Sequence, residues 1–141
     1  MKTIYALFLI CLFAVMLSSC KTVDTYSVEG LNGKWTIIAV KDEPVQSAAI
    51  TPFLEFDVAA KRVHGNTSCN QMNAAFETNT NDKAAIRFIA PVSTMMACLN
   101  METESKIVKV ITDIASVKKG ETPNRVKLVD KNGITLLLLE K

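Results

Sequence analysis

The sequence predicts a mainly β fold of the α+β class: a single-domain curved antiparallel sheet or partial barrel with one packed amphipathic helix. Three observations support this fold class. Several segments alternate apolar and polar residues with a period of two, which is typical of half-buried strands. Only residues 101–117 show the three- and four-residue period of an amphipathic helix. Near the C-terminus, Asn132 and Gly133 separate two apolar runs and predict a β-hairpin.

Residues 1–19 predict a lipoprotein signal peptide. The apolar run at residues 4–17 has the length of a secretory signal and is shorter than the roughly 20 residues of a membrane-spanning helix. Two serines followed by Cys20 resemble the bacterial lipobox, in which the cysteine is acylated, with palmitate for example, and begins the mature chain. We therefore expect a membrane anchor on Cys20. The alternative is a plain signal peptide with an incidental cysteine.

Two further regions follow the signal. Residues 20–32 are polar and without clear periodicity, and predict a tether. Residues 33–141 predict one folded domain, which is large enough for a single hydrophobic core. Loss of Lys2 with the signal leaves 15 of the 16 basic residues against 14 acidic ones. Because these charges are scattered and no basic stripe forms, we expect no nucleic-acid partner.

The predicted strands follow one another through most of this domain. They span residues 34–40, 53–58, 62–66, 84–90, 125–130 and 134–139. Trp35 is the expected core anchor of the first strand, and a turn at residues 59–61 joins the next two into a hairpin. An asparagine-rich region at residues 70–81 precedes the fourth strand, which is expected to end at Pro91.

The predicted helix carries one apolar and one polar face. The apolar face consists of Met101, Ile107, Val110, Ile111, Ile114 and Val117, and the polar face of Glu104, Lys106, Lys109 and Asp113. Asn100 is the expected N-cap. Glu102 and Glu104 in the first turns favour the helix dipole, and residues 118–120 end the helix.

Cys69 and Cys98 remain after Cys11 is removed with the signal and Cys20 is committed to lipid. Outside the cytoplasm such a pair is usually oxidised, so a disulfide is expected. Closing this loop of about 30 residues stabilises a fold by roughly 3 to 4 kcal/mol. The alternative is two separate buried thiols. Redox catalysis is not expected, because the chain has no Cys-x-x-Cys motif.

Two segments, GNTSCN at residues 65–70 and STMMACLNME at residues 93–102, resemble the META domain of HslJ-like lipoproteins. The family pattern is matched in order by Trp35, Cys69, Asn70, Thr94, Met95, Met96, Ala97, Cys98, Met101 and Glu102. One departure is Ser68, which stands where the family usually has glycine. The resemblance covers nearly all of residues 33–141. It implies a compact antiparallel β fold with one helix, on envelope-anchored proteins linked with heat stress and more loosely with secretion and virulence, and no established reaction.

Structural roles are expected for the polar and sulfur-containing motif residues. Met95 and Met96 are expected to fill space under the helix, and the alternative is a soft contact surface for an apolar partner. Glu102 is expected to interact with the helix N-terminus. Asn70 is expected to hydrogen-bond the backbone of a loop.

The sequence offers little for catalysis. His64 is the only histidine, and a dyad of His64 with Cys69 requires a free thiol, which the expected disulfide removes. No close pair of ligands predicts a metal site, and no cofactor motif occurs.

We therefore expect a non-catalytic, lipid-anchored protein of the bacterial cell envelope, with the outer membrane favoured because Lys21 follows the cysteine. Its expected role is a stress-related binding or protective module, with an envelope protein or apolar ligand as partner. The alternatives are a small hydrolytic or thiol enzyme that uses His64 and Cys69, and a secretion-accessory lipoprotein.

Overall fold

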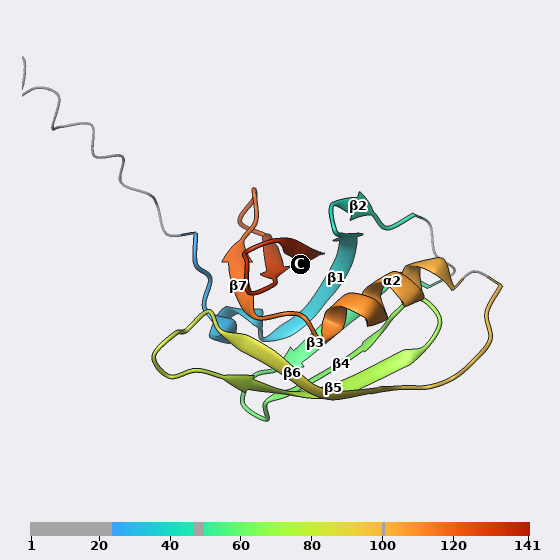
Figure 1. Cartoon of the computed structure of the whole chain (residues 1–141), viewed down its shortest axis with the longest axis horizontal. Coiled ribbons are helices and arrows are strands. Elements are labelled where there is room, and N and C mark those ends of the chain that lie inside the picture. Colours follow the sequence, from blue (N-terminus) through green and yellow to red (C-terminus); the bar gives the residue numbers. More distant parts are fainter. Residues whose placement is uncertain (1–23, 47–49, 100) are drawn as a thin grey trace, which may run out of the picture.

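The computed structural model describes residues 24–46, 50–99 and 101–141. The predicted signal and the predicted lipidation site, Cys20, lie outside these residues. The elements are the 3₁₀-helix η1 (Val28–Leu31), the strands β1 (Gly33–Val40), β2 (Glu43–Pro44), β3 (Phe53–Asp57), β4 (Arg62–Asn66), β5 (Gln71–Thr78) and β6 (Ile86–Ser93), the helix α2 (Glu102–Ile111), and the strands β7 (Ser116–Lys119), β8 (Arg125–Val129) and β9 (Thr135–Glu140) (Figure 1).

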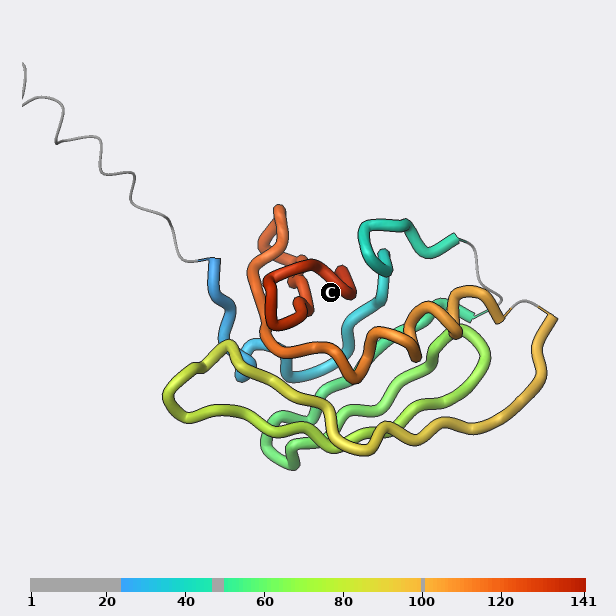
Figure 2. The backbone as a smooth tube through the Cα atoms, in the orientation of Figure 1, coloured from blue at the N-terminus to red at the C-terminus, as the bar shows by residue number. Residues whose placement is uncertain are grey.

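The strands form one nine-stranded antiparallel sheet in the order β6-β5-β4-β3-β1-β9-β8-β7, with β2 paired to β1. The sheet curls until its two ends meet locally, where the Ile86 N–H donates to the Ala115 carbonyl at 3.1 Å. The chain trace in Figure 2 follows this curvature. α2 lies across the open side of the curved sheet (Figure 1). The predicted mainly β fold with one packed helix is therefore confirmed.

The core lies between α2 and the concave side of the sheet. Helix residues Ile107 and Ile111 are buried with residues of almost every strand in one cluster. Trp35 is fully buried, as predicted, and its indole N–H donates to the Leu31 carbonyl at 2.6 Å. Since a buried indole N–H needs an acceptor, this bond also fixes η1 against the start of β1.

The folded domain begins before Gly33, so the predicted tether of residues 20–32 extends too far. Val28 and Leu31 are both buried in the core. They lie on the same side of η1, because a 3₁₀-helix has three residues per turn. The Val28 N–H also donates to the Lys83 carbonyl at 2.9 Å. Two apolar residues in a short polar segment are too weak a pattern to predict this turn.

The asparagine-rich region contains β5, a strand that the sequence pattern did not predict. Met72, Ala74 and Phe76 are buried, and the residues between them are exposed. This period of two is typical of a strand with one wet face. The asparagines hid the pattern because they are depleted in strands.

β6 continues past Pro91, which was predicted to end it, and reaches Ser93. Because β6 is the outermost strand beyond β5, the missing N–H of Pro91 costs no bond within the sheet. Ala90 has a φ of +43°, and the register with β5 shifts nearby. Together these irregularities make this edge a poor template for another strand.

The helix is shorter than predicted. α2 ends at Ile111, Ile114 is buried in the following loop, and Val117 lies in β7. Residues 118 and 119, predicted to end the helix, belong to that strand. The N-cap is Met101 rather than Asn100, without a side-chain hydrogen bond, and Asn100 itself is outside the described residues. The helix was predicted to be too long because Ile114 in the loop and Val117 on the buried face of β7 happen to continue the helical spacing of apolar residues.

The C-terminal hairpin is confirmed. β8 and β9 pair antiparallel, and Gly133 in the turn has a φ of +82°, which favours glycine. The Asp130 carboxylate accepts hydrogen bonds from the N–H groups of Ile134 at 2.9 Å and Asn132 at 2.8 Å. These bonds lower the pKa of Asp130, with the Ile134 bond as the main cause.

Within the described ranges, none of the helices has the length and apolar character needed to cross a membrane.

Candidate binding surface

The segment between β6 and α2 carries most of the motif residues. We call residues 94–99 the methionine loop. A disulfide joins Cys98 in this loop to Cys69, which follows β4, with the two Cα atoms 6.2 Å apart. The predicted cysteine pair is thus bonded. It attaches the end of the loop to the body of the sheet.

Asn70 fixes the other part of the loop through hydrogen bonds. Its side-chain oxygen accepts from the Met96 N–H and from the Thr94 hydroxyl, both at 2.7 Å. Its amide nitrogen donates to the Met96 carbonyl at 3.2 Å. The predicted bonding of Asn70 to a loop backbone is therefore confirmed, and one side chain holds both polar backbone groups of Met96.

Glu104 completes this arrangement from the first turns of α2. Its Oε1 accepts from the Asn70 side-chain amide at 2.8 Å and its Oε2 from the Asn70 backbone N–H at 3.1 Å. Only 6% of the residue is exposed. The assignment of Glu104 to the polar face was wrong. Glu104 precedes Ile107 by three residues and Ile111 by seven. This helical spacing places Glu104 on the same, buried face and could have predicted its burial.

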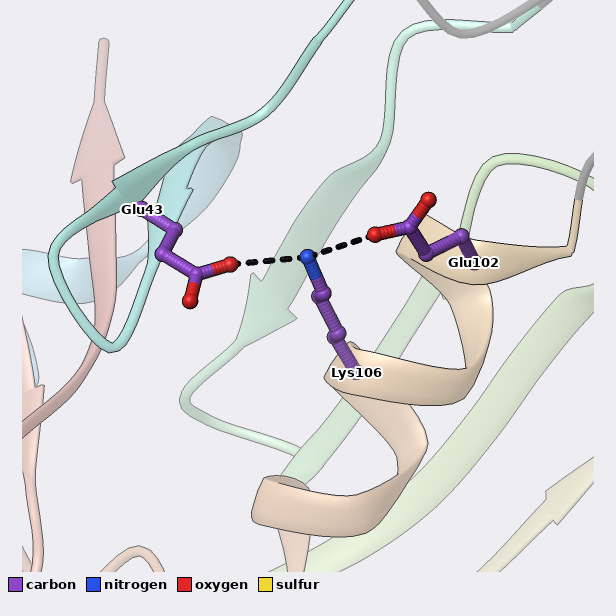
Figure 3. A network of polar contacts seen from close by, with 3 residues as sticks. All are labelled: Glu43, Glu102 and Lys106. Carbon is purple, nitrogen blue, oxygen red and sulfur yellow. Dashed lines mark hydrogen bonds and ion pairs between the residues drawn. The ribbon is translucent and has the colours of Figure 1, made fainter.

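Glu102, the glutamate of the family motif, lies on the surface in the first turn of α2. Lys106 contacts both Glu102 Oε1 at 2.8 Å and Glu43 Oε2 at 2.7 Å, which links α2 to β2 (Figure 3). The hydrogen bond from Lys106 lowers the pKa of Glu102, and the bonds to Glu102 and then Glu43 raise the pKa of Lys106. These exposed pairs orient the helix and add little stability.

The methionine loop presents its apolar side chains to solvent. Met95 is 98% exposed and Leu99 is 111% exposed, and Met96 is also exposed. The expected filling of space under the helix by Met95 and Met96 is therefore wrong. Among the methionines in the described residues, only Met72 belongs to the core. The disulfide and Asn70 hold the loop backbone outside the core, so its side chains have no interior to fill.

The remaining motif residues lie around the loop or in the core. Ala97 is an exposed loop residue, and Met101 caps α2 at the end of the segment. Trp35 lies in the core, away from this surface. Most of the motif residues therefore lie in the methionine loop or beside it.

The structure does not assemble the alternative catalytic dyad. His64 is on the outer face of β4, where its Nε2 lies 3.3 Å from Glu55 Oε2 and its ring is edge-on to Phe53. Cys69 is buried and bonded to Cys98. No group of three or more potential metal ligands occurs among the described residues.

A cleft of about 1120 Å³ lies at the opposite end of α2 from the loop, between the β1–β2, β5–β6 and β8–β9 turns. Its rim mixes cations such as Lys41 and Arg87 with anions such as Asp42 and Asp113. Neither His64 nor Cys69 lines it. It therefore offers volume for a small molecule, and none of the groups predicted for chemistry.

The fold and the surface together define a class: small α+β domains with a curved antiparallel sheet, one helix across it and a disulfide-held surface loop. The chain belongs to the META domain family, whose pattern it matches over residues 27–141.

Two solved structures resemble it. One is the NMR structure of a protein from Burkholderia xenovorans, with 17% sequence identity, a TM-score of 0.63 and coverage of 87% of this chain and 93% of that chain. Another NMR structure has 16% identity, a TM-score of 0.56 and coverage of 78% of this chain and 89% of that chain. At these identities the likeness concerns the fold alone. Comparison with curated proteins finds no match.

Proposed function

We propose that the chain is a non-catalytic, lipid-anchored protein of the bacterial cell envelope, and that its META domain binds an apolar partner through the methionine loop. The lipobox-like segment before Cys20 supports the anchor. The family resemblance supports a stress-related role. Lys21 after the cysteine favours the outer membrane.

The observation that carries this proposal is the contrast between a fixed loop backbone and free apolar side chains. A disulfide and the Asn70 hydrogen bonds hold the backbone. Met95 and Leu99 still project almost entirely into solvent. Methionine is flexible and polarisable, and is favoured at adaptable binding surfaces. Ordering the backbone in advance also reduces the entropy that binding must overcome.

The test is complementation in the bacterium that carries the gene, with survival of heat stress as the measurement. The double variant Met95→Ser, Met96→Ser should fail to restore survival, because it removes apolar contact area without touching the core. His64→Ala is the matched control and should restore survival fully. Both proteins must accumulate to wild-type levels. If survival is lost with His64→Ala and not with the methionine double variant, the result would favour the enzyme alternative.

A further inference from the structure

We propose that the partner of the methionine loop is the phospholipid bilayer itself, and that Met95 and Leu99 insert into its interfacial region. This inference rests on the proposed function, since it names the partner of the same surface. Four features of the loop favour a lipid partner over a protein partner.

The first feature is the absence of charge. The sequence has no charged residue between Arg87 and Glu102, so the end of β6, the loop and the N-cap Met101 are neutral, and charge begins with Glu102 in the first turn of α2. Charged side chains are costly in a bilayer and neutral apolar ones are favoured there. Surfaces that bind proteins usually surround an apolar centre with a polar and charged rim. Residues 88–101 contribute no charged side chain to such a rim.

The second feature is the shape of the surface. Met95 and Leu99 are 98% and 111% exposed, which means that both side chains project beyond their neighbours. A projecting loop is suited to insertion, because its tip can enter the interface while the rest of the domain stays in water. Monotopic attachment buries apolar side chains by only about 5–10 Å in this way.

The third feature is the state of the loop backbone. A peptide group that enters a region poor in water must already have its hydrogen bonds. The N–H and C=O of Met96 both bond to Asn70, and the Thr94 N–H donates to the Gln71 carbonyl at 3.0 Å. Asn70 therefore lowers the desolvation cost of the Met96 peptide groups, at the centre of the loop, as well as fixing the shape of the loop.

The fourth feature is the position of the predicted anchor. The carbonyl of Asp24, the first described residue, accepts a hydrogen bond from the Lys119 N–H at the end of β7, and Cys20 precedes Asp24 by four residues. Figures 1 and 2 show that this entry point and the methionine loop lie at opposite ends of the domain. An acylated Cys20 keeps the bilayer at high effective concentration, so weak insertion of the loop suffices. Two attachments at opposite ends would hold the domain flat on the membrane.

The test measures contact between the loop and acyl chains in the lipidated protein. Leu99→Trp and, as matched control, Ile134→Trp are reconstituted into vesicles of phosphatidylethanolamine and phosphatidylglycerol with brominated acyl chains, which quench tryptophan fluorescence. Both positions are exposed, so neither substitution disturbs the core. The wild-type protein supplies the background from buried Trp35. Insertion predicts a roughly twofold or larger loss of emission from the indole introduced at position 99, and unchanged emission from the indole introduced at position 134.

Equal quenching at positions 99 and 134 would overturn the inference. The complementation experiment separates its failure from that of the proposed function. If the Met95→Ser, Met96→Ser protein fails in cells while position 99 is not quenched, the loop binds a protein and only the lipid assignment is wrong. If position 99 is quenched and that double variant protects cells fully, the loop meets lipid and the proposed role of the contact is wrong.

Discussion

The side chains of Asn70 and Glu104 connect the methionine loop, the segment after β4 and the first turns of α2. Burying a carboxyl group is costly unless its oxygens accept hydrogen bonds. Both Glu104 oxygens do so, from the two nitrogen donors of one asparagine. Asn70 in turn bonds the backbone of Met96. One pair of side chains therefore positions the methionine loop and the helix together.

Replacing Glu104 by alanine should be strongly destabilising. Glu104→Ala leaves the backbone N–H and one side-chain N–H of Asn70 without their acceptors, which should lower the free energy of unfolding by about 1 to 3 kcal/mol. Urea denaturation measures this change. Glu102→Ala, in the same helix, is the control and should have a clearly smaller effect because Glu102 is on the surface. Equal effects of the two substitutions would show that the Asn70 contact adds no stability.

Ser68 occupies a backbone conformation that suits glycine, the residue usual at this position in the family. Its φ is +96° and its buried hydroxyl has no hydrogen-bond partner among the described residues. A side chain in this region of φ is strained. The departure from the family pattern therefore has a structural cost.

Ser68→Gly should stabilise the protein by about 1 kcal/mol, because the relief of strain and of the unpaired hydroxyl exceeds the added flexibility of the unfolded chain. Ser68→Ala removes only the hydroxyl and should give a smaller gain. Thermal unfolding of the two variants beside the wild type measures both effects. A lower melting temperature for Ser68→Gly would contradict this assignment.

At the scale of the elements, the disulfide joins two segments that are separated by β5 and β6. It closes a 29-residue separation and attaches the methionine loop to the end of β4. Reduction should lower the free energy of unfolding by roughly 3 to 4 kcal/mol, because the unfolded chain regains the freedom of that loop. Urea denaturation with and without reductant measures the change. The Cys69→Ser, Cys98→Ser protein is the control and should not respond to reductant.

The sequence predicts these elements well where the pattern is local. A period of two was sufficient to predict the strands β1, β3 and β4. The turn residues were sufficient to predict the β8–β9 hairpin. The end of α2 was not predictable, because Ile114 and Val117 are buried by the sheet at positions that continue the helical period. β5 was missed because Asn73 within it and the asparagines on either side of it are depleted in strands, and because Asn73 lies on the solvent face, where packing rather than propensity decides.

The candidate site was predicted in part. The cysteine pair was predicted because Cys69 and Cys98 remain once the other two cysteines are assigned to the signal and the lipid. The role of Asn70 was predicted from the usual hydrogen bonding of asparagine in turns.

The spacing of Glu104 to Ile107 and Ile111 indicates its burial, but its partner Asn70 comes from a distant segment of the chain. The exposure of Met95 depends on where the disulfide and Asn70 hold the loop. Residue type alone suggests the opposite, with glutamate outside and methionine inside.

At the scale of the whole molecule, the proposed anchor on Cys20 would set where the methionine loop works. Cys20→Ser should move the protein from the membrane fraction to the soluble fraction, or leave the precursor uncut, because the thiol is the predicted acylation site. Fractionation of cells and the mass of the protein measure this outcome. A variant of mature size that remains in the membrane fraction would refute acylation.

The methionine loop is the proposed contact surface of this META domain. The most direct measurement places a photo-reactive amino acid at position 95 of the lipidated protein in living cells, with position 134 as an exposed control. Contact through the loop predicts adducts at position 95 after illumination and few at position 134, and the mass of each adduct identifies lipid or protein. Equal yields at the two positions would contradict it.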